Sequence, residues 1–168
     1  MTLARRQSTP SAHGAAPAER PLAVHLVTFG CQMNQYDSLL VEGRFRSAGH
    51  RIAGSIGEAD VVLFNTCSVR EHAEERVYSW LGELRQEKRR RPELLIGVLG
   101  CLAQRAQEEV FRRAGHVDLV VGTRRFHRLP QLVDELRARR AERGRAERVL
   151  DVDMDDAVAV ERTGETYA

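Results

Sequence analysis

Three cysteines, each at the end of an apolar run, most constrain what this chain can fold into. Cys31 follows the run 24–29, Cys67 follows 61–66 and Cys101 follows 94–100, and the sequence contains no other cysteine. Short apolar runs bounded by turn residues are typical of buried β-strands. The pattern therefore predicts three strands that end at thiols, at nearly equal intervals along the chain.

Helical patterns alternate with the apolar runs along the whole central part of the sequence. This alternation predicts an α/β fold: a single doubly wound parallel sheet, flavodoxin- or Rossmann-like, with helices on both faces. Asn34 is expected to cap the first helix, and Ser68 with Glu71 to form a capping box for the second. We expect strands at 24–29, 50–53, 61–64, 94–99 and 117–121, and helices at 34–48, 68–91, 102–114 and 126–140.

Two details of these elements are open to direct test. The strand at 50–53 is followed by only seven residues (54–60) before the next strand, which is short for a parallel crossover. The apolar stripes of the first two helices are expected to face the core. These stripes contain Leu40, Val41, Phe45 and Ala48 in the first helix and Val77, Trp80, Leu81 and Leu84 in the second.

The composition indicates one domain with two tails. An Ala-, Ser- and Pro-rich start predicts a disordered extension at 1–21, before a domain at 22–140 and a linker at 141–168. No apolar run approaches the roughly 18 residues of a membrane helix, so we expect no membrane contact. The odd number of cysteines argues against a disulfide framework, and we expect a monomer in a reducing cytoplasm.

In a parallel sheet the carboxyl ends of all strands share one edge, where ligands bind. The three cysteines are therefore expected at that edge, beside helix N-termini that favour thiolates. Thiolates of this kind hold iron–sulfur clusters, and three of them leave one iron of a cubane open to an exchangeable ligand. Gly30 and Gly100 would let the backbone approach such a cluster closely.

Three other interpretations of the cysteines stay open at this point. A free cysteine is commonly a small buried hydrophobic residue. A zinc site is a second possibility, with His72 as a fourth ligand, although zinc usually selects shorter spacings between its cysteines. A catalytic thiol is the third, but no base lies beside any of the three cysteines in sequence.

The charge is unevenly distributed, although the net formal charge is only +2. Charge asymmetry of this kind can mark nucleic-acid contact, and a solvated helix face is the simpler alternative. Basic residues also recur between 124 and 148, whereas the last segment is acidic. The densest basic group lies at the end of the second predicted helix and contains Arg85, Lys88, Arg89, Arg90 and Arg91.

The segments around the cysteines resemble the N-terminal domain of the radical-SAM methylthiotransferases, over residues 22–136. The matching motifs are GCQMNQYDS at 30–38, NTCSVRE at 65–71 and GVLGC at 97–101, followed by VGT at 121–123 and HRLP at 127–130. Within the family, the residues after Cys31 and Cys67 resemble the branch that acts on tRNA.

The resemblance implies that Cys31, Cys67 and Cys101 hold an auxiliary [4Fe-4S] cluster that carries the sulfur or methylthio group for transfer. It implies Gly30, Asn34, Asn65, Thr66, Ser68 and Gly100 as candidates for the cluster pocket. The basic group at 85–91 would contact the tRNA anticodon stem-loop. S-adenosylmethionine and a second [4Fe-4S] cluster would belong to a further domain of the full-length enzyme.

The sequence departs from the family because it has no C-x₃-C-x₂-C motif with which to bind that second cluster. We expect a fragment that lacks the radical-SAM domain and the C-terminal RNA-binding domain. We therefore expect an enzyme domain that is inactive alone. The alternative is a non-catalytic module of the same fold that binds zinc or RNA.

Overall fold

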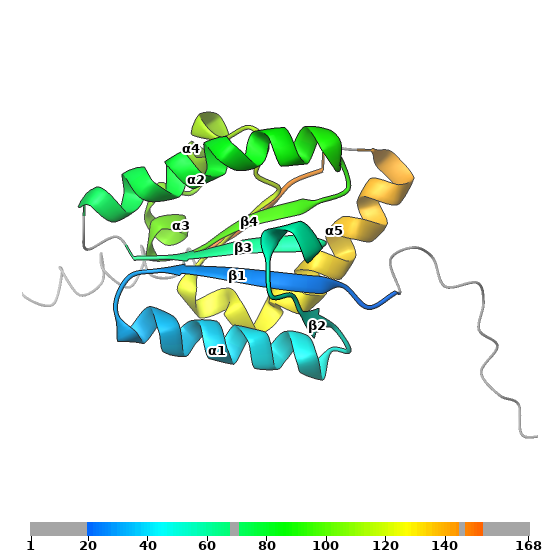
Figure 1. Ribbon diagram of the computed structural model, residues 1–168, viewed down its shortest axis with the longest axis horizontal. Helices are drawn as coiled ribbons and strands as arrows, with labels where there is room; N and C mark the ends of the chain where they lie inside the picture. Colours follow the sequence, from blue (N-terminus) through cyan, green and yellow to red (C-terminus); the bar gives the residue numbers. More distant parts are fainter. Residues whose placement is uncertain (1–19, 68–70, 145–146, 153–168) are drawn as a thin grey trace, which may run out of the picture.

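The computed structural model describes residues 20–67, 71–144 and 147–152. Six parallel strands form one sheet in the order β2-β1-β3-β4-β5-β6 (Figure 1). The strands are β1 (Ala23–Phe29), β2 (Arg51–Ile52), β3 (Val61–Thr66), β4 (Leu95–Gly100), β5 (Leu119–Val121) and β6 (Val149–Asp151). The helices are α1 (Gln32–Ser47), α2 (Glu71–Arg90), α3 (Cys101–Ala106), α4 (Glu108–Arg113) and α5 (Leu129–Arg143), with 3-10 turns η2 (Ile56–Glu58) and η3 (Thr123–Arg128).

The sheet carries helices on both faces, and each face has its own apolar core. Successive residues of a strand point to opposite faces, so Val62 and Phe64 of β3 face one core while Val61 and Leu63 face the other. α2, α3 and α4 cover the first core, and α1 and α5 cover the second (Figure 1). The doubly wound α/β fold expected from the sequence is confirmed.

The connection between β2 and β3 is short because it contains no helical crossover, and the two strands are not adjacent in the sheet. Both pair with β1, one on each side, and the chain passes across the end of β1 through the single turn η2. β6 lies in the segment that the sequence analysis assigned to a linker, and it pairs in parallel with β5. The linker predicted at 141–168 also begins inside α5, which ends at Arg143. Residues 1–19 of the extension predicted at 1–21, Ser68, and residues 145–146 and 153–168 of the linker lie outside the described residues.

Several local predictions were wrong. Asn34 does not cap α1, because the helix begins at Gln32 with Cys31 at its N-cap. Trp80 and Leu40 are 40% and 47% exposed and lie off the buried stripes, which contain Val77, Leu81, Leu84, Val41 and Phe45. The predicted helix at 102–114 is two short helices that meet at Gln107, whose φ of 48° breaks the helical backbone.

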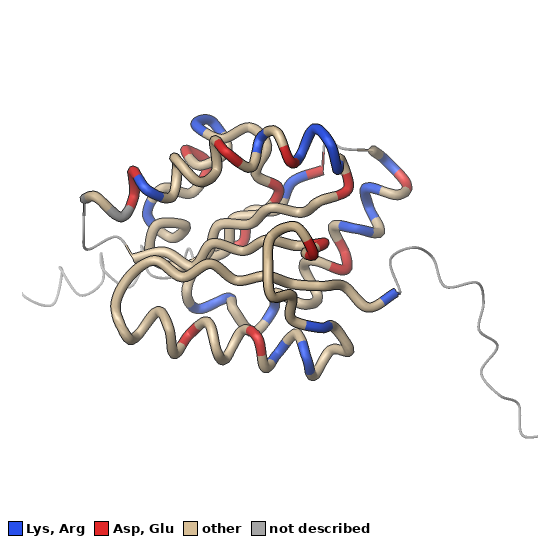
Figure 2. The backbone as a smooth tube through the Cα atoms, viewed as in Figure 1, with Lys and Arg blue, Asp and Glu red and all other residues tan. Residues whose placement is uncertain are grey.

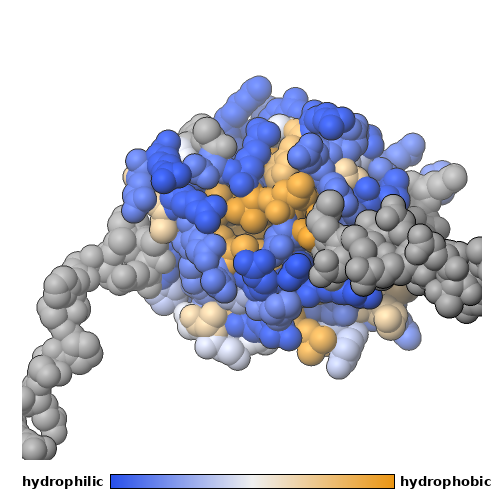
Figure 3. Space-filling model, turned by 180° about the vertical axis from the view of Figure 1, so that it is seen from behind, coloured by the Kyte–Doolittle hydropathy of each residue, from blue (hydrophilic) through white to orange (hydrophobic). Residues whose placement is uncertain are grey.

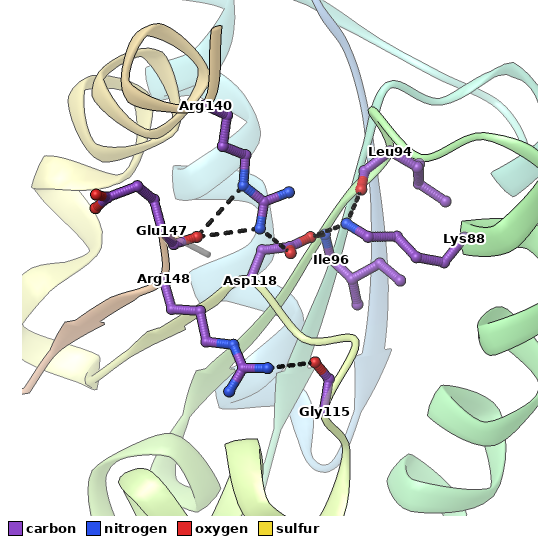
Figure 4. A network of polar contacts seen from close by, with 8 residues as sticks. All are labelled: Lys88, Leu94, Ile96, Gly115, Asp118, Arg140, Glu147 and Arg148. Atoms are coloured by element: carbon purple, nitrogen blue, oxygen red, sulfur yellow. Dashed lines mark hydrogen bonds and ion pairs between the residues drawn. The ribbon is translucent and has the colours of Figure 1, made fainter. Parts of the chain in front are cut away.

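Asp118 is the centre of a buried ionic network at the amino edge of the sheet (Figure 4). Its carboxylate accepts hydrogen bonds from Lys88 of α2, from Arg140 of α5 and from the backbone N–H of Ile96, the last at 2.8 Å. Arg140 also donates to the carbonyl of Glu147, just before β6. One carboxylate thus joins a helix from each face of the sheet to β4, β5 and the start of β6.

Asp118→Asn is expected to lower the free energy of unfolding by about 3 kcal/mol, because it leaves two largely buried cations without their counter-charge. Urea denaturation followed by circular dichroism would measure the loss. Glu135→Gln on α5 is the control, since its carboxylate is 40% exposed and its pair with Arg139 is long, at 3.8 Å. That change should stay within about 0.5 kcal/mol. A loss below about 1 kcal/mol for Asp118→Asn would contradict a stabilising role for this network.

Candidate metal centre

The pairing of β1, β3 and β4 brings the three cysteines to one edge of the sheet. Phe29 pairs with Thr66, and Thr66 pairs with Gly100, so the last residues of three adjacent strands lie in one row. Cys67 and Cys101 come one residue after this row and Cys31 two residues after it. Adjacent strands lie about 4.8 Å apart, so the three cysteine backbones leave neighbouring points of the edge. The backbone N–H of Cys67 still bonds to the carbonyl of Phe29, at 3.1 Å.

The three thiols differ in exposure. Cys31 is exposed, Cys101 is half-buried and Cys67 is buried. Among the described residues, no three His, Cys, Asp or Glu side chains are grouped closely enough to hold a metal ion. The fold therefore brings the cysteines to one edge, and the side chains would have to turn inward to meet at a common centre.

Two glycines provide the room at this edge. A Cβ on Gly30 would lie 2.8 Å from the Cβ of Cys67 and 2.6 Å from Oδ1 of Asn34. A Cβ on Gly100 would lie 2.5 Å from the carbonyl oxygen of Thr66. Both glycines have positive φ, and the pair φ 93°, ψ −155° at Gly100 is almost confined to glycine. The backbone before Cys31 and Cys101 can therefore adopt this path only with glycine.

A chain of polar side chains lies beneath Cys31, between β1, α1 and β3. The thiol of Cys31 donates to Oδ1 of Asn34 at 3.4 Å, and Nδ2 of Asn34 donates to Oδ1 of Asn65 at 3.5 Å. Nδ2 of Asn65 donates to the carbonyl of Asn34 at 2.8 Å and to Oγ of Ser38 at 3.0 Å. The hydroxyls of Ser38 and Thr28 complete the chain at 2.7 Å.

The other candidate residues of the pocket lie apart from this chain. Thr66 is fully buried and donates to the carbonyl of Leu99, so it joins β3 to β4 just before Cys67 and Cys101. Ser68 lies outside the described residues. His72, considered above as a zinc ligand, is exposed on α2. Burial raises the pKa of Asp37, which lies on α1 between the exposed Tyr36 and the buried Ser38.

The basic group at the end of α2 lies far from the cysteines. α2 has 20 residues and spans about 30 Å, and its last turn, with basic residues in blue in Figure 2, lies away from the carboxyl ends of β3 and β4 (Figure 1). Lys88 pairs with Asp118, and Arg91 pairs with Glu87 and donates to the carbonyls of Ile56 and Ala59. Lys88 and Arg91 therefore have internal partners, whereas Arg85, Arg89 and Arg90 are exposed.

The site residues that sequence reasoning missed are Ser38 and Thr28. Both are ordinary polar residues in sequence, one on the helical pattern and one in the strand pattern. A signal was available, because Ser38 falls three residues before Val41 and seven before Phe45, both expected on the core-facing stripe of the helix. A polar residue on such a stripe must find a hydrogen-bond partner beneath the helix.

The structure defines a doubly wound domain with a candidate metal centre at the ends of three strands. Comparison with known proteins gives the family of this domain. Residues 23–122, from β1 to the end of β5, match the family described as "Uncharacterized protein family UPF0004". The chain belongs to this family, which is the N-terminal domain of the methylthiotransferases.

Individual relatives agree with this assignment. The chain is 48% identical over 113 residues to the tRNA-2-methylthio-N(6)-dimethylallyladenosine synthase of Rhodopirellula baltica, covering 67% of this chain and 24% of the relative. It is 50% identical over 125 residues to the synthase of the same name from Burkholderia thailandensis, covering 74% and 26%. The chain thus spans about a quarter of the length of the curated relatives it matches.

Gly100→Ala is expected to destabilise the domain by about 3 kcal/mol, because the new Cβ would meet the backbone of Thr66 in a conformation almost confined to glycine. Gly82→Ala is the matched control, since Gly82 is exposed within α2 and nothing lies within 4 Å of the added Cβ. This control should gain about 0.5–1 kcal/mol from the helix preference of alanine. Thermal and urea unfolding would measure both changes, and equal stability of the two variants would contradict the constraint at Gly100.

Proposed function

We propose that this chain is the sulfur-donor domain of a radical-SAM tRNA methylthiotransferase, and that Cys31, Cys67 and Cys101 hold its auxiliary [4Fe-4S] cluster. The observation that carries the proposal is the placement of all three cysteines after the last paired residues of three adjacent parallel strands. Cysteines that served only as core residues would have no reason to occupy equivalent positions at the ends of three adjacent strands. The relatives support the same reaction class, since each is a methylthio-adenosine synthase by name.

The residues at the edge suit such a cluster. Three thiolates are the ligands that iron–sulfur clusters select. Gly30 and Gly100 leave space where any side chain would collide with Cys67, Asn34 or Thr66. Cys31 lies at the N-cap of α1, where the positive end of the helix favours an anionic ligand.

When bound by Cys31, Cys67 and Cys101, the cluster would supply the sulfur or methylthio group for transfer. The chain's own residues hold and orient that centre. Thr66 ties the ends of β3 and β4 together through its bond to Leu99, so the backbones of Cys67 and Cys101 keep a fixed separation. Burial of Cys67 keeps water from one side of the centre, and exposure of Cys31 leaves the other side open to a large substrate.

The substrate proposed is tRNA, with transfer to C2 of N6-dimethylallyladenosine beside the anticodon. S-adenosylmethionine and its [4Fe-4S] cluster would act from the part of the enzyme that this chain does not span. We further propose a monomer in the cytoplasm. None of the helices in the described ranges is long and apolar enough to cross a membrane.

The basic residues of α2 would then contact tRNA phosphates remote from the modified base. Arg85, Arg89 and Arg90 are exposed on the last two turns of α2, about 20–30 Å along the helix from its first residue. A tRNA is long enough to reach both edges. These three arginines would therefore contribute sequence-independent affinity and leave the chemistry to the cysteine edge.

A non-catalytic zinc-binding module of the same fold is the second candidate, because cysteine thiolates are also zinc ligands and His72 follows Cys67 by five residues. Zinc normally takes four protein ligands in a structural site. His72 lies in the first turn of α2 and is exposed, so it would be the candidate for a ligand beside the cysteines. Metal analysis separates the two candidates directly.

Anaerobic reconstitution of this chain with iron and sulfide is expected to yield about four irons and four sulfides per chain. Each of Cys31→Ala, Cys67→Ala and Cys101→Ala should lose most of the cluster absorption, because removal of one thiolate leaves only two ligands. His72→Ala is the matched control and should keep the full iron content. One zinc per chain without sulfide, lost in His72→Ala, would contradict the cluster and favour the zinc module.

Replacing both Arg89 and Arg90 by Gln is expected to weaken the binding of a tRNA anticodon stem-loop and to lower the slope of log K against log salt by about 1.5. Each phosphate contact that is lost lowers the number of counterions released on binding by slightly less than one, so losing two contacts gives this change in slope. Replacing Arg44 and Arg46 of α1 by Gln removes the same charge from another exposed helix end and serves as control. Unchanged affinity and slope for the α2 variant, in filter binding at several salt concentrations, would show that these arginines do not contact tRNA.

A further inference from the structure

The turn that follows β5 is basic and lies at the same edge of the sheet as the cysteines. β5 pairs with β4 so that Val121 lies beside Leu99, and continuing this register by two residues sets Thr123 beside Cys101. The turn η3 therefore begins about 4.8 Å, one strand spacing, from the backbone of Cys101. Its six residues include Arg124, Arg125 and Arg128.

The whole of this turn stays close to the cysteine edge. η3 packs against α3, the helix that begins at Cys101, and a Cβ added at Gly122 would collide with the side chain of Gln104 on α3. Six residues with a rise of about 2.0 Å each span ~12 Å. The arginines of η3 are therefore closer to the cysteines than those of α2, which lie about 20–30 Å along their helix.

Two of these arginines share one carboxylate. Nη1 of Arg128 donates to Oδ2 of Asp151 at 2.7 Å, and Nε of Arg125 lies 3.6 Å from Oδ1 of the same residue. One negative charge on β6 thus faces two positive charges on η3. Arg124 is adjacent to them and exposed, so the turn presents an excess of positive charge to solvent.

The shared carboxylate leaves most of the donors of Arg125 and Arg128 unused. The side chain of Asp151 is 14% exposed, whereas those of Arg125 and Arg128 are 33% and 37% exposed, so the carboxylate lies deeper than either guanidinium group. Nε of Arg125 is buried and has no hydrogen-bond acceptor among the described residues. Guanidinium groups anchored from below and open from above suit an anion with several oxygens, of which phosphate is the usual one.

Other exposed surface of the molecule is less suited to phosphate. The face turned away from the viewer in Figure 1 has an apolar patch surrounded by hydrophilic residues (Figure 3). An apolar patch has no charge with which to attract a phosphate, whereas η3 carries three guanidinium groups beside the cysteine edge.

We propose that η3 binds the phosphates that flank the target adenosine of tRNA, with Arg124, Arg125 and Arg128 as the contacts and Asp151 as their anchor. This inference rests on the proposed function. An enzyme that modifies a base inside a folded nucleic acid has to take that base out of the stack and hold it against the reacting centre. Phosphate contacts beside the base fix its register without reading sequence. Cations one strand away from Cys101 are placed for this task.

A purely structural role is the simpler alternative for these arginines. Arg128 alone would tie η3 to β6 through Asp151, and a partly exposed ion pair of this kind contributes about 0–1 kcal/mol. In that case Arg124 and Arg125 would have no specific relation to any phosphate of the substrate. The two roles therefore differ in whether the arginines are energetically coupled to particular phosphates.

The test is a double-mutant cycle between the 168-residue chain, reconstituted with iron and sulfide, and an anticodon stem-loop that contains N6-dimethylallyladenosine. Neutral methylphosphonates replace the phosphates on both sides of that adenosine and should weaken wild-type binding at least about tenfold. The double variant Arg124→Gln, Arg125→Gln should bind the unaltered stem-loop about tenfold more weakly, with a salt slope lower by about 1.4 for two single-strand contacts. It should lose no more than about twofold on methylphosphonate replacement, because the contacts are already absent.

Three controls separate this coupling from general charge and from stability. The double variant Arg89→Gln, Arg90→Gln removes the same charge at the end of α2 and should keep the full methylphosphonate effect. Methylphosphonates in the stem, away from the target adenosine, should affect the wild type and the η3 variant equally. Arg124→Gln alone leaves both partners of Asp151 in place, so it tests the coupling even if the double variant fails to fold.

The chain's own acidic residues are a competing partner that the same assay examines. Asp153, Asp155 and Asp156 follow β6 in the sequence and lie outside the described residues. Replacing all three by Asn should preserve the coupling, because it belongs to the arginines and the RNA phosphates. Loss of the coupling in that variant would contradict the proposed contact.

Equal sensitivity of the wild type and the η3 variants to the flanking methylphosphonates would overturn this inference and leave the proposed function intact. A reconstituted wild-type chain without measurable affinity for the stem-loop at low salt would do the same. A chain that takes up no iron and sulfide would overturn both, because the target adenosine would have no centre to meet. Iron and sulfide analysis of each preparation thus distinguishes the two failures.

Discussion

In-register pairing of β1, β3 and β4 up to their last residues is the constraint on which the candidate centre depends. Phe29, Thr66 and Gly100 lie in one row, so the chain leaves three neighbouring strands at the same level and meets a cysteine within two residues each time. A one-residue slip of any strand would move its thiol along the edge by about 3.3 Å and reverse which face each core residue occupies. The two apolar cores on opposite faces of the sheet therefore also fix the site.

The two edges of the sheet serve different purposes. At the amino edge, Asp118 neutralises Lys88 and Arg140 and so ties helices from both faces to the central strands. At the carboxyl edge, Gly30 and Gly100 have no side chains, and the backbone can turn sharply there. The thiol of Cys31 is exposed and that of Cys101 is half-buried. In parallel sheets ligands usually bind outside the carboxyl ends of the strands, which is the edge where these glycines and cysteines lie.

Most of the fold could be predicted because its signals are local. Apolar runs bounded by turn residues predicted both ends of β1, β3, β4 and β5 to within two residues, and the alternation with helical patterns predicted the parallel sheet. The errors arose where long-range packing overrode the local pattern. Trp80 belongs to an apolar stripe in sequence, yet the face it occupies is not covered, and β6 is stable only because it can pair with β5. The break at Gln107 also had no signal, since the residues on both sides favour helix.

The sequence by itself determined the class of fold, the identity of the three cysteines and their position after strands, because these depend on residue type and order along the chain. Only the tertiary structure decided which side chains meet. It showed that Lys88 and Arg91 have internal partners, that Asn34 lies within α1 and not at its cap, and that Thr28, Ser38, Asn65 and Asn34 connect to Cys31. The last four residues are up to 37 positions apart in the chain. No local sequence pattern predicts a hydrogen bond between them, because each partner depends on strand register and on the rotation of the helix about its axis.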